Sequence, residues 1–363
     1  MSSVSINGVW KYYGKTPAVK ELNIEVQDGE FLCILGPSGC GKSSTLRMLA
    51  GLENISAGKI LFGDREVNGL PPKDRDIAMV FENYALYPHK SVYDNIANSL
   101  RLRKTEKSVI DQKVKRAAKL LEIDGLLDRK PMELSGGQKQ RVAIGRAIVR
   151  EPKLFLFDEP IAHLDAKLRA HMRGELKLLQ RELGTTMIYV THDQLEALSM
   201  ADRIAVMHEG VLQQLDTPQN VYNNPVNEWV AGFVGEPPMN FIDCNILNRG
   251  GKLFVEHANF LVPLAQKQAS LLLQSRAMGK IRVGVRPDEI AISAKPGDKS
   301  IPGKILVTEP LGGDMLVDMT IGEHKLMVKT KPDFRGAMGE ECHIKFDTDH
   351  WHLFDMDSGK AYF

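Results

Sequence analysis

Eight residues near the N-terminus combine glycines, a lysine and a serine at a spacing that suits phosphate chemistry. They are Gly36, Pro37, Ser38, Gly39, Cys40, Gly41, Lys42 and Ser43. Glycines let a backbone wrap closely around phosphate oxygens, so that successive N–H groups and the start of a following helix face the anion. Lys42 would then neutralise the β- and γ-phosphates, and the hydroxyl of Ser43 would coordinate Mg²⁺. The pattern predicts a phosphate-binding loop, and we include the next residue, Ser44, among the predicted nucleotide contacts.

Two acidic residues follow a continuous apolar run farther along the chain. Leu154-Phe155-Leu156-Phe157 leads directly into Asp158 and Glu159. Ligands of open α/β sheets bind at the carboxyl ends of the parallel strands, so Asp158 is placed to hold Mg²⁺, directly or through water. Glu159 is placed to polarise an attacking water as a general base. Alone, the two acids are equally compatible with a structural role; together with a phosphate loop they indicate nucleotide hydrolysis.

A second glycine motif begins another helical run. Ser135, Gly136, Gly137 and Gln138 precede an apolar pattern that continues to Val149. A Ser-Gly-Gly helix start offers backbone N–H donors and a hydroxyl, which suits another phosphate.

These residues need a scaffold of short buried strands alternating with helices. Residues 31–35 form an apolar run that enters the phosphate loop, and residues 42–49 have a helical pattern. Residues 154–157 and 187–190 are further continuous apolar runs, as expected of strands covered on both faces. Ile110, Val114, Ala117 and Leu121 form one apolar stripe on a helix. We therefore predict an α/β domain over residues 1–235, with a helical subdomain at about residues 85–150.

The last part of the chain has a different pattern. A turn-rich join at Val234-Gly235-Glu236-Pro237-Pro238 precedes β-favouring segments that are separated by glycine turns. Residues 305–307 and 315–321 are expected to pair as a hairpin. We predict a small antiparallel β-barrel, OB-like, over residues 236–363.

Length and charge narrow the possible functions. The chain has 363 residues and a net charge of +1, which gives no global attraction to nucleic acid or to an anionic membrane. Its apolar runs fall far short of the ~18 residues of a membrane span. Four cysteines without metal-ligand spacing indicate reduced thiols, and the N-terminus lacks the pattern of a secretory signal, so the cytoplasm is the expected compartment.

The motif Leu134-Ser135-Gly136-Gly137-Gln138 resembles the signature of the nucleotide-binding subunits of ATP-binding-cassette (ABC) transporters. The C-terminal part is similar to the regulatory barrel of the maltose-type sugar-importer ATPases, particularly over Val285-Arg286-Pro287-Asp288-Glu289-Ile290. The resemblance covers the whole chain. It implies a P-loop ATPase that uses ATP and Mg²⁺.

The same resemblance implies further roles. Tyr13, just before Gly14, would stack on adenine, and His192 would contact the γ-phosphate. The segment from Tyr84 to His89 resembles the surface on which this family docks its membrane subunits.

Three positions depart from the family pattern. Glu82 stands where a glutamine usually contacts Mg²⁺ and the reacting water, and as a carboxylate it still suits Mg²⁺. Ala162 and His163 replace the more usual serine and asparagine, while Asp165, a dimer contact in the family, is retained.

The first hypothesis is an ATPase subunit of an ABC importer for sugars, polyols or glycerol phosphates, peripheral on the cytoplasmic face of the membrane. The resemblance implies a head-to-tail pair, in which each ATP lies between the phosphate loop of one subunit and the Ser135 motif of the other. A homodimer is favoured and a heterodimer is left open. Two membrane-spanning permease subunits and an extracytoplasmic solute-binding protein complete the implied system.

A second hypothesis is a regulatory protein whose C-terminal domain senses a ligand while ATP acts as a switch with little turnover. Glu82 and Ala162 support it. A third, a DNA-repair ATPase of the same superfamily, requires long coiled-coil heptads between the motifs. The sequence has none, and its near-neutral charge also argues against a nucleic-acid partner.

Overall fold

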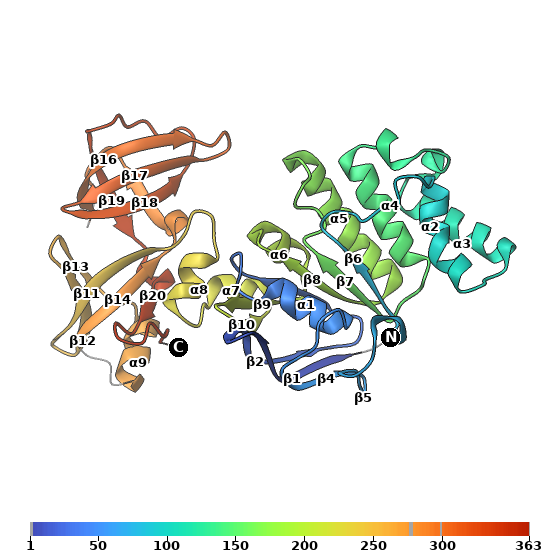
Figure 1. Cartoon of the computed structure of the whole chain (residues 1–363). Coiled ribbons are helices and arrows are strands. Elements are labelled where there is room, and N and C mark those ends of the chain that lie inside the picture. Colours follow the sequence, from blue (N-terminus) through green and yellow to red (C-terminus); the bar gives the residue numbers. More distant parts are fainter. Residues whose placement is uncertain (1–2, 276–278, 298–299, 363) are drawn as a thin grey trace. The chain divides into compact units, whose positions relative to one another are not determined.

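The chain forms two compact units, Met1–Gln219 and Asn220–Phe363. The computed structural model describes residues 3–275, 279–297 and 300–362. In Figure 1 the first unit runs from blue to yellow-green and the second from yellow to red. Within these described ranges, every helix is too short or too polar to span a lipid bilayer.

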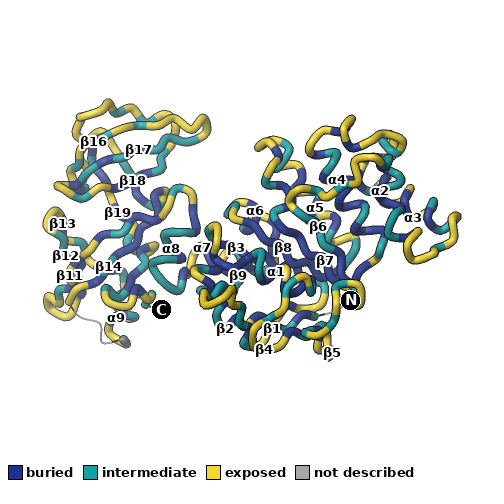
Figure 2. Tube along the Cα trace, viewed as in Figure 1, coloured by how far each residue is buried: buried dark blue, intermediate teal, exposed yellow. Residues whose placement is uncertain are grey.

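A six-stranded sheet is the centre of the first unit, with the strand order β10-β9-β3-β8-β7-β6. The strands are β3 (Phe31–Leu35), β6 (Ile77–Val80), β7 (Leu154–Asp158), β8 (Thr186–Thr191), β9 (Arg203–His208) and β10 (Val211–Asp216). All pairings are parallel except β9 with β10. Every residue of β3, β7 and β8 is buried, and Figure 2 shows these strands in dark blue. The predicted α/β class is confirmed, because strands covered on both faces need apolar residues at every position.

A four-stranded antiparallel sheet, which the sequence analysis did not predict, completes this unit. Its order is β2-β1-β4-β5, with β1 (Val4–Tyr13), β2 (Thr16–Val26), β4 (Ala57–Phe62) and β5 (Arg65–Glu66). Buried Ile24 of this sheet shares one core with Leu46 of helix α1 and Leu156 of β7. Helix α1 is therefore held by apolar packing against both sheets.

Six helices belong to the first unit. They are α1 (Lys42–Ala50), α2 (Val92–Leu102), α3 (Lys107–Leu120), α4 (Gly136–Ile148), α5 (Ala166–Leu183) and α6 (Gln194–Met200), with 3-10 turns at Pro72–Asp74, Asp124–Leu126 and Pro131–Glu133. The predicted apolar stripe is confirmed, since Ile110, Val114, Ala117 and Leu121 are all buried. Helices α2, α3 and α4 contact one another.

The second unit is built on two five-stranded antiparallel sheets. One has β11 (Asn240–Arg249), β12 (Lys252–His257), β13 (Phe260–Pro263), β14 (Lys280–Val285) and β20 (His352–Phe354); the other has β15 (Ile290–Ser293), β16 (Ile301–Pro310), β17 (Met315–Ile321), β18 (His324–Thr330) and β19 (Glu341–Phe346). Helices α7 (Pro218–Asn223), α8 (Glu228–Phe233) and α9 (Gln266–Ser275) and 3-10 turns η4 (Pro287–Glu289) and η5 (Thr348–His350) accompany them. The predicted hairpin is confirmed by the antiparallel pairing of β16 with β17.

The compact units divide between Gln219 and Asn220, earlier than the boundary expected at residue 235. Hydrogen bonds join residues 220–235 to the C-terminal sheets. Arg286 donates to the carbonyl oxygens of Tyr222 at 2.7 Å, Ala231 at 3.2 Å and Val234. The backbone N–H of Glu228 also donates to the carbonyl of Gly359 at 2.8 Å.

Candidate nucleotide site

The predicted phosphate loop lies between β3 and α1, and its glycines are required by close backbone approaches. Gly41 has φ +102°, and a Cβ there would lie 2.5 Å from the carbonyl oxygen of Ala18. A Cβ on Gly36 would lie 2.3 Å from the carbonyl oxygen of Met207. No described side chain caps the N-terminus of α1, so its first N–H groups are left for an anion.

Lys42 is held inside the curve of this loop. Its Nζ donates to the carbonyl oxygens of Gly36 at 2.8 Å and Pro37 at 3.0 Å, and lies 4.0 Å from Glu159 Oε1. The residue is only 4% exposed. A buried cation beside backbone carbonyls and a carboxylate is positioned to exchange these contacts for phosphate oxygens.

Asp158 ends β7 and faces the loop. It accepts a hydrogen bond from Ser43 Oγ at 3.0 Å. Burial raises the pKa of Asp158 and the negative charge of Glu82 adds to this, while the Ser43 hydrogen bond opposes them. A hydroxyl and a carboxylate in contact supply the hard oxygen ligands that Mg²⁺ prefers, so these residues fit the metal.

Glu159 has a strained backbone. Its φ is +45°, in the left-handed region that non-glycine residues rarely adopt. The N–H of Glu159 donates to the carbonyl of Val190 at 3.0 Å, which holds this conformation. Its Oε2 lies 2.7 Å from Nδ1 of His192, the residue that follows β8. Backbone strain of this kind concentrates at functional sites.

Two of the departures from the family pattern contact each other. Nε2 of His163 lies 3.2 Å from Glu82 Oε1, and both side chains are about half exposed, at 59% and 51%. The loop of Glu82 and the loop after Glu159 are therefore joined by this pair.

Tyr13 lies at the end of β1 and is 47% exposed. Its hydroxyl donates to Glu53 and lies 3.1 Å from Ser44 Oγ, which must then act as the donor. Burial raises the pKa of Tyr13, and the hydrogen bond to Glu53 adds to this. Lys11 Nζ lies 4.9 Å from the ring centroid. The predicted aromatic residue is thus bonded to the residue that follows the phosphate loop.

The signature residues form the start of α4 and lie apart from this group. Ser135 is the N-cap of α4 and exchanges hydrogen bonds with Gln138, which forms a capping box. A Cβ on Gly137 would lie 2.6 Å from the Leu168 side chain, and one on Gly136 would lie 3.4 Å from Leu164. Across the described residues, this motif shares no hydrogen bond with the phosphate loop.

The segment from Tyr84 to His89 is mostly exposed. Its backbone forms hydrogen bonds with the side chains of Asn95 and Arg146. The buried Asn95 amide accepts from the N–H of Tyr87 at 2.8 Å and donates to the carbonyls of Tyr87 and Lys90 at 3.1 and 3.2 Å. Arg146 of α4 donates to the carbonyl of Tyr84 at 3.1 Å.

Several of these partners were missed at the sequence level. Glu53, Asn95 and Arg146 meet their partners only through the fold, and no local pattern marks them. Asp193 did carry a signal, because it follows His192 directly; it caps α6 and pairs with Arg169 at 3.2 Å.

Another group with acidic residues, outside the predicted set, is formed by the turn after α3 and by helix α5. Glu122, His171 and Glu175 bring their ligand atoms within 4.8 Å of one another. Arg141 donates to Glu122 at 3.1 Å and to Glu175 at 2.7 Å. The guanidinium offsets part of the charge of these carboxylates and His171 lies 2.7 Å from Glu175, so this cluster is an ion-pair network.

Comparison with known proteins identifies the family. Residues 19–162 match the ABC transporter family model, residues 235–290 the MalK OB fold domain and residues 283–354 the TOBE domain. The chain is 49% identical to the trehalose/maltose import ATP-binding protein MalK of Thermococcus litoralis over 100% of both chains. It is 45% identical to the sn-glycerol-3-phosphate import ATP-binding protein UgpC of Psychromonas ingrahamii, over 99% of this chain and 95% of the relative.

A solved structure is also similar: cbiO1 from Clostridium perfringens, part of the ABC transporter complex cbiONQ. It has a TM-score of 0.56 and 31% identity, and it covers 60% of this chain and 89% of that one. The predicted family is confirmed by the full-length similarities to the two import ATP-binding proteins. The chain belongs to the ABC transporter family, as an import ATP-binding protein that carries a MalK-type OB fold and a TOBE domain.

Proposed function

We propose that this chain binds ATP at residues 36–44 and hydrolyses it, with Glu159 as the general base, to drive uptake of a sugar, polyol or glycerol phosphate. As a member of its family the chain is an ATPase of an import system. The solute class is proposed from the relatives, whose names specify trehalose/maltose and sn-glycerol-3-phosphate import. The observation that carries the mechanism is Glu159, held with φ +45° between Lys42 and His192.

The phosphates would lie against the N-terminus of α1. The open N–H groups there and the ammonium of Lys42 would replace water around the anion. Lys42 would exchange its present hydrogen bonds, to the carbonyls of Gly36 and Pro37, for bonds to phosphate oxygens. Tyr13 would stack on adenine, oriented by its bonds to Ser44 and Glu53.

Ser43, Asp158 and Glu82 are the residues that would hold Mg²⁺. When bound, the metal would supply positive charge against the β- and γ-phosphates. Asp158 already accepts from the Ser43 hydroxyl at 3.0 Å, so both oxygens are preorganised.

Glu159 would orient a water and take its proton at a carboxylate oxygen. The bond between His192 Nδ1 and Glu159 Oε2, at 2.7 Å, fixes the direction of that carboxylate. His192 would add a donor near the γ-phosphate. The strained backbone at Glu159 keeps the acid at the edge of the sheet, where Asp158 and Ser43 meet.

We further propose the assembly that the signature motif requires. Ser135, Gly136 and Gly137 would contact the ATP of a second subunit, either a second copy or a related chain. The exposed segment from Tyr84 to His89 would dock two membrane-spanning permease subunits at the cytoplasmic face, in a system with an extracytoplasmic solute-binding protein. The exposed Tyr87, braced by Lys90 at 4.5 Å, supports a docking role.

The test compares ATP hydrolysis and oligomeric state in the wild type, Glu159→Gln and the exposed control Glu182→Gln. Glu159→Gln is expected to lose hydrolysis by at least about a hundredfold while retaining ATP and forming an ATP-dependent dimer. Glu182→Gln is expected to match the wild type. Wild-type turnover in Glu159→Gln would refute the base assignment, and ATP binding with negligible wild-type turnover would favour the ATP-switch alternative.

A further inference from the structure

A cavity in the C-terminal unit has features of a ligand site. Its volume is about 660 Å³, and it lies entirely within residues 222–362. Helices α7 and α9, the turns η4 and η5, strand β20 and the C-terminal residues contribute to its wall. This volume is in the range of small-molecule sites.

Four residues that line this cavity each carry a buried polar side-chain atom with no hydrogen-bond partner among the described residues. The atoms are Gln268 Oε1, Arg286 Nε, Glu289 Oε2 and Trp351 Nε1. Gln268, Arg286 and Trp351 are 3%, 1% and 4% exposed. Most buried polar atoms in proteins are paired, so several unpaired atoms around one cavity require an explanation.

Two of the side chains that carry these atoms, Gln268 and Arg286, are fixed by their other hydrogen bonds. Gln268 Nε2 donates to the carbonyls of Asp349 at 2.8 Å and Trp351 at 3.4 Å, which leaves its oxygen free as an acceptor. Arg286 uses its outer nitrogens on backbone carbonyls and lies 4.1 Å above the ring centroid of Tyr222. The oxygen of Gln268 and the Nε of Arg286 are therefore held in place by the fold.

The chemistry of the wall favours hydroxyl groups. The unpaired atoms of Trp351 and Arg286 are hydrogen-bond donors, and those of Gln268 and Glu289 are oxygens that can accept. A hydroxyl group can both donate and accept, so it can pair with either kind of atom. Cationic Lys267 and Arg286 are offset by the acids Asp288, Glu289 and Asp349, so the wall has no excess of positive charge for an anion.

Two titratable groups reinforce this neutrality. Burial raises the pKa of Glu289, and burial lowers the pKa of His352 to about 4, with the charge of Arg286 acting in the same direction. His352 is therefore uncharged at neutral pH.

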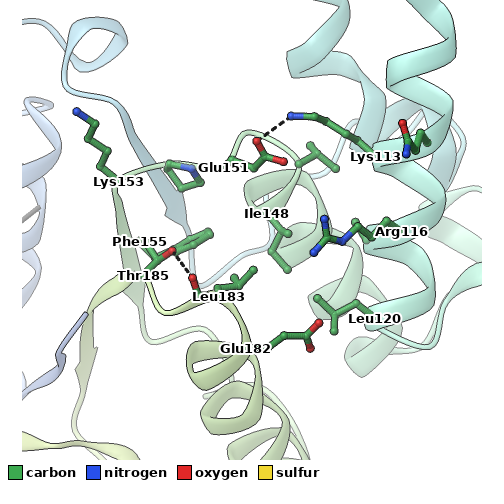
Figure 3. A pocket seen from close by; sticks show the side chains of 14 residues that line it. Lys113, Arg116, Leu120, Ile148, Glu151, Lys153, Phe155, Glu182, Leu183 and Thr185 are labelled. Carbon is green, nitrogen blue, oxygen red and sulfur yellow. Dashed lines mark hydrogen bonds and ion pairs between the residues drawn. The ribbon is translucent and has the colours of Figure 1, made fainter. Parts of the chain in front are cut away.

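Another cavity contrasts with this one. Figure 3 shows it in the N-terminal unit, where Lys113 pairs with Glu151 at 2.9 Å and Thr185 donates to the carbonyl of Leu183. Its volume is about 510 Å³, and none of its described lining residues carries an unpaired buried polar side-chain atom. It has no comparable set of recognition groups.

We propose that the cavity bounded by Gln268, Arg286 and Trp351 is a binding site for a neutral polyhydroxylated molecule: a monosaccharide, a disaccharide or a polyol. The site is separate from the nucleotide site, and the inference does not depend on the proposed hydrolysis. The ligand would reach it from the rim, where Asn223, Lys267 and Asp288 are exposed, and these side chains must move aside to uncover the buried atoms.

The experiment uses the full chain without nucleotide. Maltose, trehalose and sorbitol are titrated by calorimetry and by tryptophan fluorescence, with glycerol 3-phosphate and inorganic phosphate as anionic probes. At least one neutral compound is expected to bind saturably and to change the fluorescence. Gln268→Leu keeps the side-chain volume and is expected to weaken that binding at least about tenfold, whereas Gln266→Leu, an exposed glutamine on the same helix, is expected to leave it unchanged.

Thermal unfolding first establishes that each variant is folded. If Gln268→Leu does not fold, Trp351→Phe carries the test, because it removes the indole N–H and keeps an aromatic ring; it is expected to weaken binding in the same way. The proposal is overturned if no neutral compound binds at tens of millimolar, if Gln268→Leu and Gln266→Leu bind alike, or if only the anions bind.

Discussion

At the residue scale, the contact between Glu82 and His163 links two departures from the family pattern. The amide-to-carboxylate change at Glu82 adds a negative charge, and His163 places a ring nitrogen 3.2 Å from it. Both side chains are about half exposed, so the pair contributes little to stability. The pair matters because of its effect on Asp158. Burial raises the pKa of Asp158, and the negative charge of Glu82 raises it further.

Glu82→Gln is therefore expected to change metal use and not stability. Removal of one carboxylate from the proposed Mg²⁺ ligands should raise the Mg²⁺ concentration for half-maximal ATP hydrolysis by about tenfold. Metal titration of the ATPase, with thermal unfolding in parallel, measures both quantities. His163→Asn is the control and should keep the wild-type Mg²⁺ dependence. An unchanged midpoint in Glu82→Gln would exclude this carboxylate as a ligand.

His352 should make the C-terminal unit sensitive to acid. Its pKa falls from about 6.5 in an unfolded chain to about 4 here, chiefly because of burial. Above pH 6.5 the residue is neutral in both states; as pH falls from about 6.5 to about 4 only the unfolded state gains the proton, so the free energy of unfolding decreases by up to about 3 kcal/mol. Calorimetric unfolding should show a shallower pH dependence in His352→Gln. Parallel curves for the two proteins would contradict this origin.

The acids of the site were predictable from single residues, but their partners were not. Short local motifs mark the phosphate loop and the pair Asp158 and Glu159. A glycine turn and a buried strand each produce a recognisable pattern in consecutive residues. The contact of Tyr13 with Glu53 joins residues 40 positions apart, and no local spacing marks it.

At the scale of elements, the sheets differ in how well the sequence predicts them. The strands β3, β7 and β8 are buried on both faces and read as unbroken apolar runs, so they were found. Strand β1 pairs with β2 through several register shifts, which interrupt the alternation of a half-buried strand. That interruption explains why the four-stranded sheet was not predicted.

The segment from Tyr84 to His89 should depend on helix α2 for its order. Asn95 is fully buried and makes four hydrogen bonds to the backbone of Tyr87, Lys90 and Ser91. Asn95→Ala removes them, so the N–H of Tyr87 and the carbonyl of Lys90 lose this side-chain partner. Hydrogen exchange at residues 87–91 is expected to accelerate at least about tenfold, while the central sheet keeps its protection.

The matched control for this change is Leu102→Ala, on the same helix and 79% exposed. It should leave exchange at residues 87–91 at the wild-type rate. Equal exchange in wild type and Asn95→Ala would show that the segment is held by other contacts, such as the bond from Arg146 to Tyr84.

At the scale of the whole molecule, buried Arg286 ties the segment before Gly235 to the C-terminal unit. Its guanidinium donates to three backbone carbonyls from the segment between Asn220 and Val234. The sequence placed the boundary at the glycine and proline turn after Val234, because composition changes there. Composition alone does not show that Arg286, later in the chain, forms hydrogen bonds to the segment that contains helices α7 and α8.

Arg286→Met should therefore destabilise the C-terminal unit. Two buried carbonyls and one partly buried carbonyl lose their donor, and the expected loss is about 3 kcal/mol in the free energy of unfolding. Differential scanning calorimetry should show a lower transition for this unit, with the N-terminal transition unmoved. Arg335→Met is the control, since exposed Arg335 donates only to nearby Pro332 and Phe334. A C-terminal transition as high as that of the wild type would remove Arg286 from this role.

The same arginine determines where the gene can be cut and rejoined. A hybrid protein joined at residue 236 would combine the C-terminal sheets with residues 220–235 of another protein. Those foreign residues would have to supply carbonyl groups to Arg286 and an N–H group to the carbonyl of Gly359, as residues 220–235 do here. A hybrid joined between Gln219 and Asn220 inherits donor and acceptors together. The residues from Asn220 onward are thus expected to be exchanged between relatives as one module, with the junction placed before Pro218 so that helix α7 stays whole.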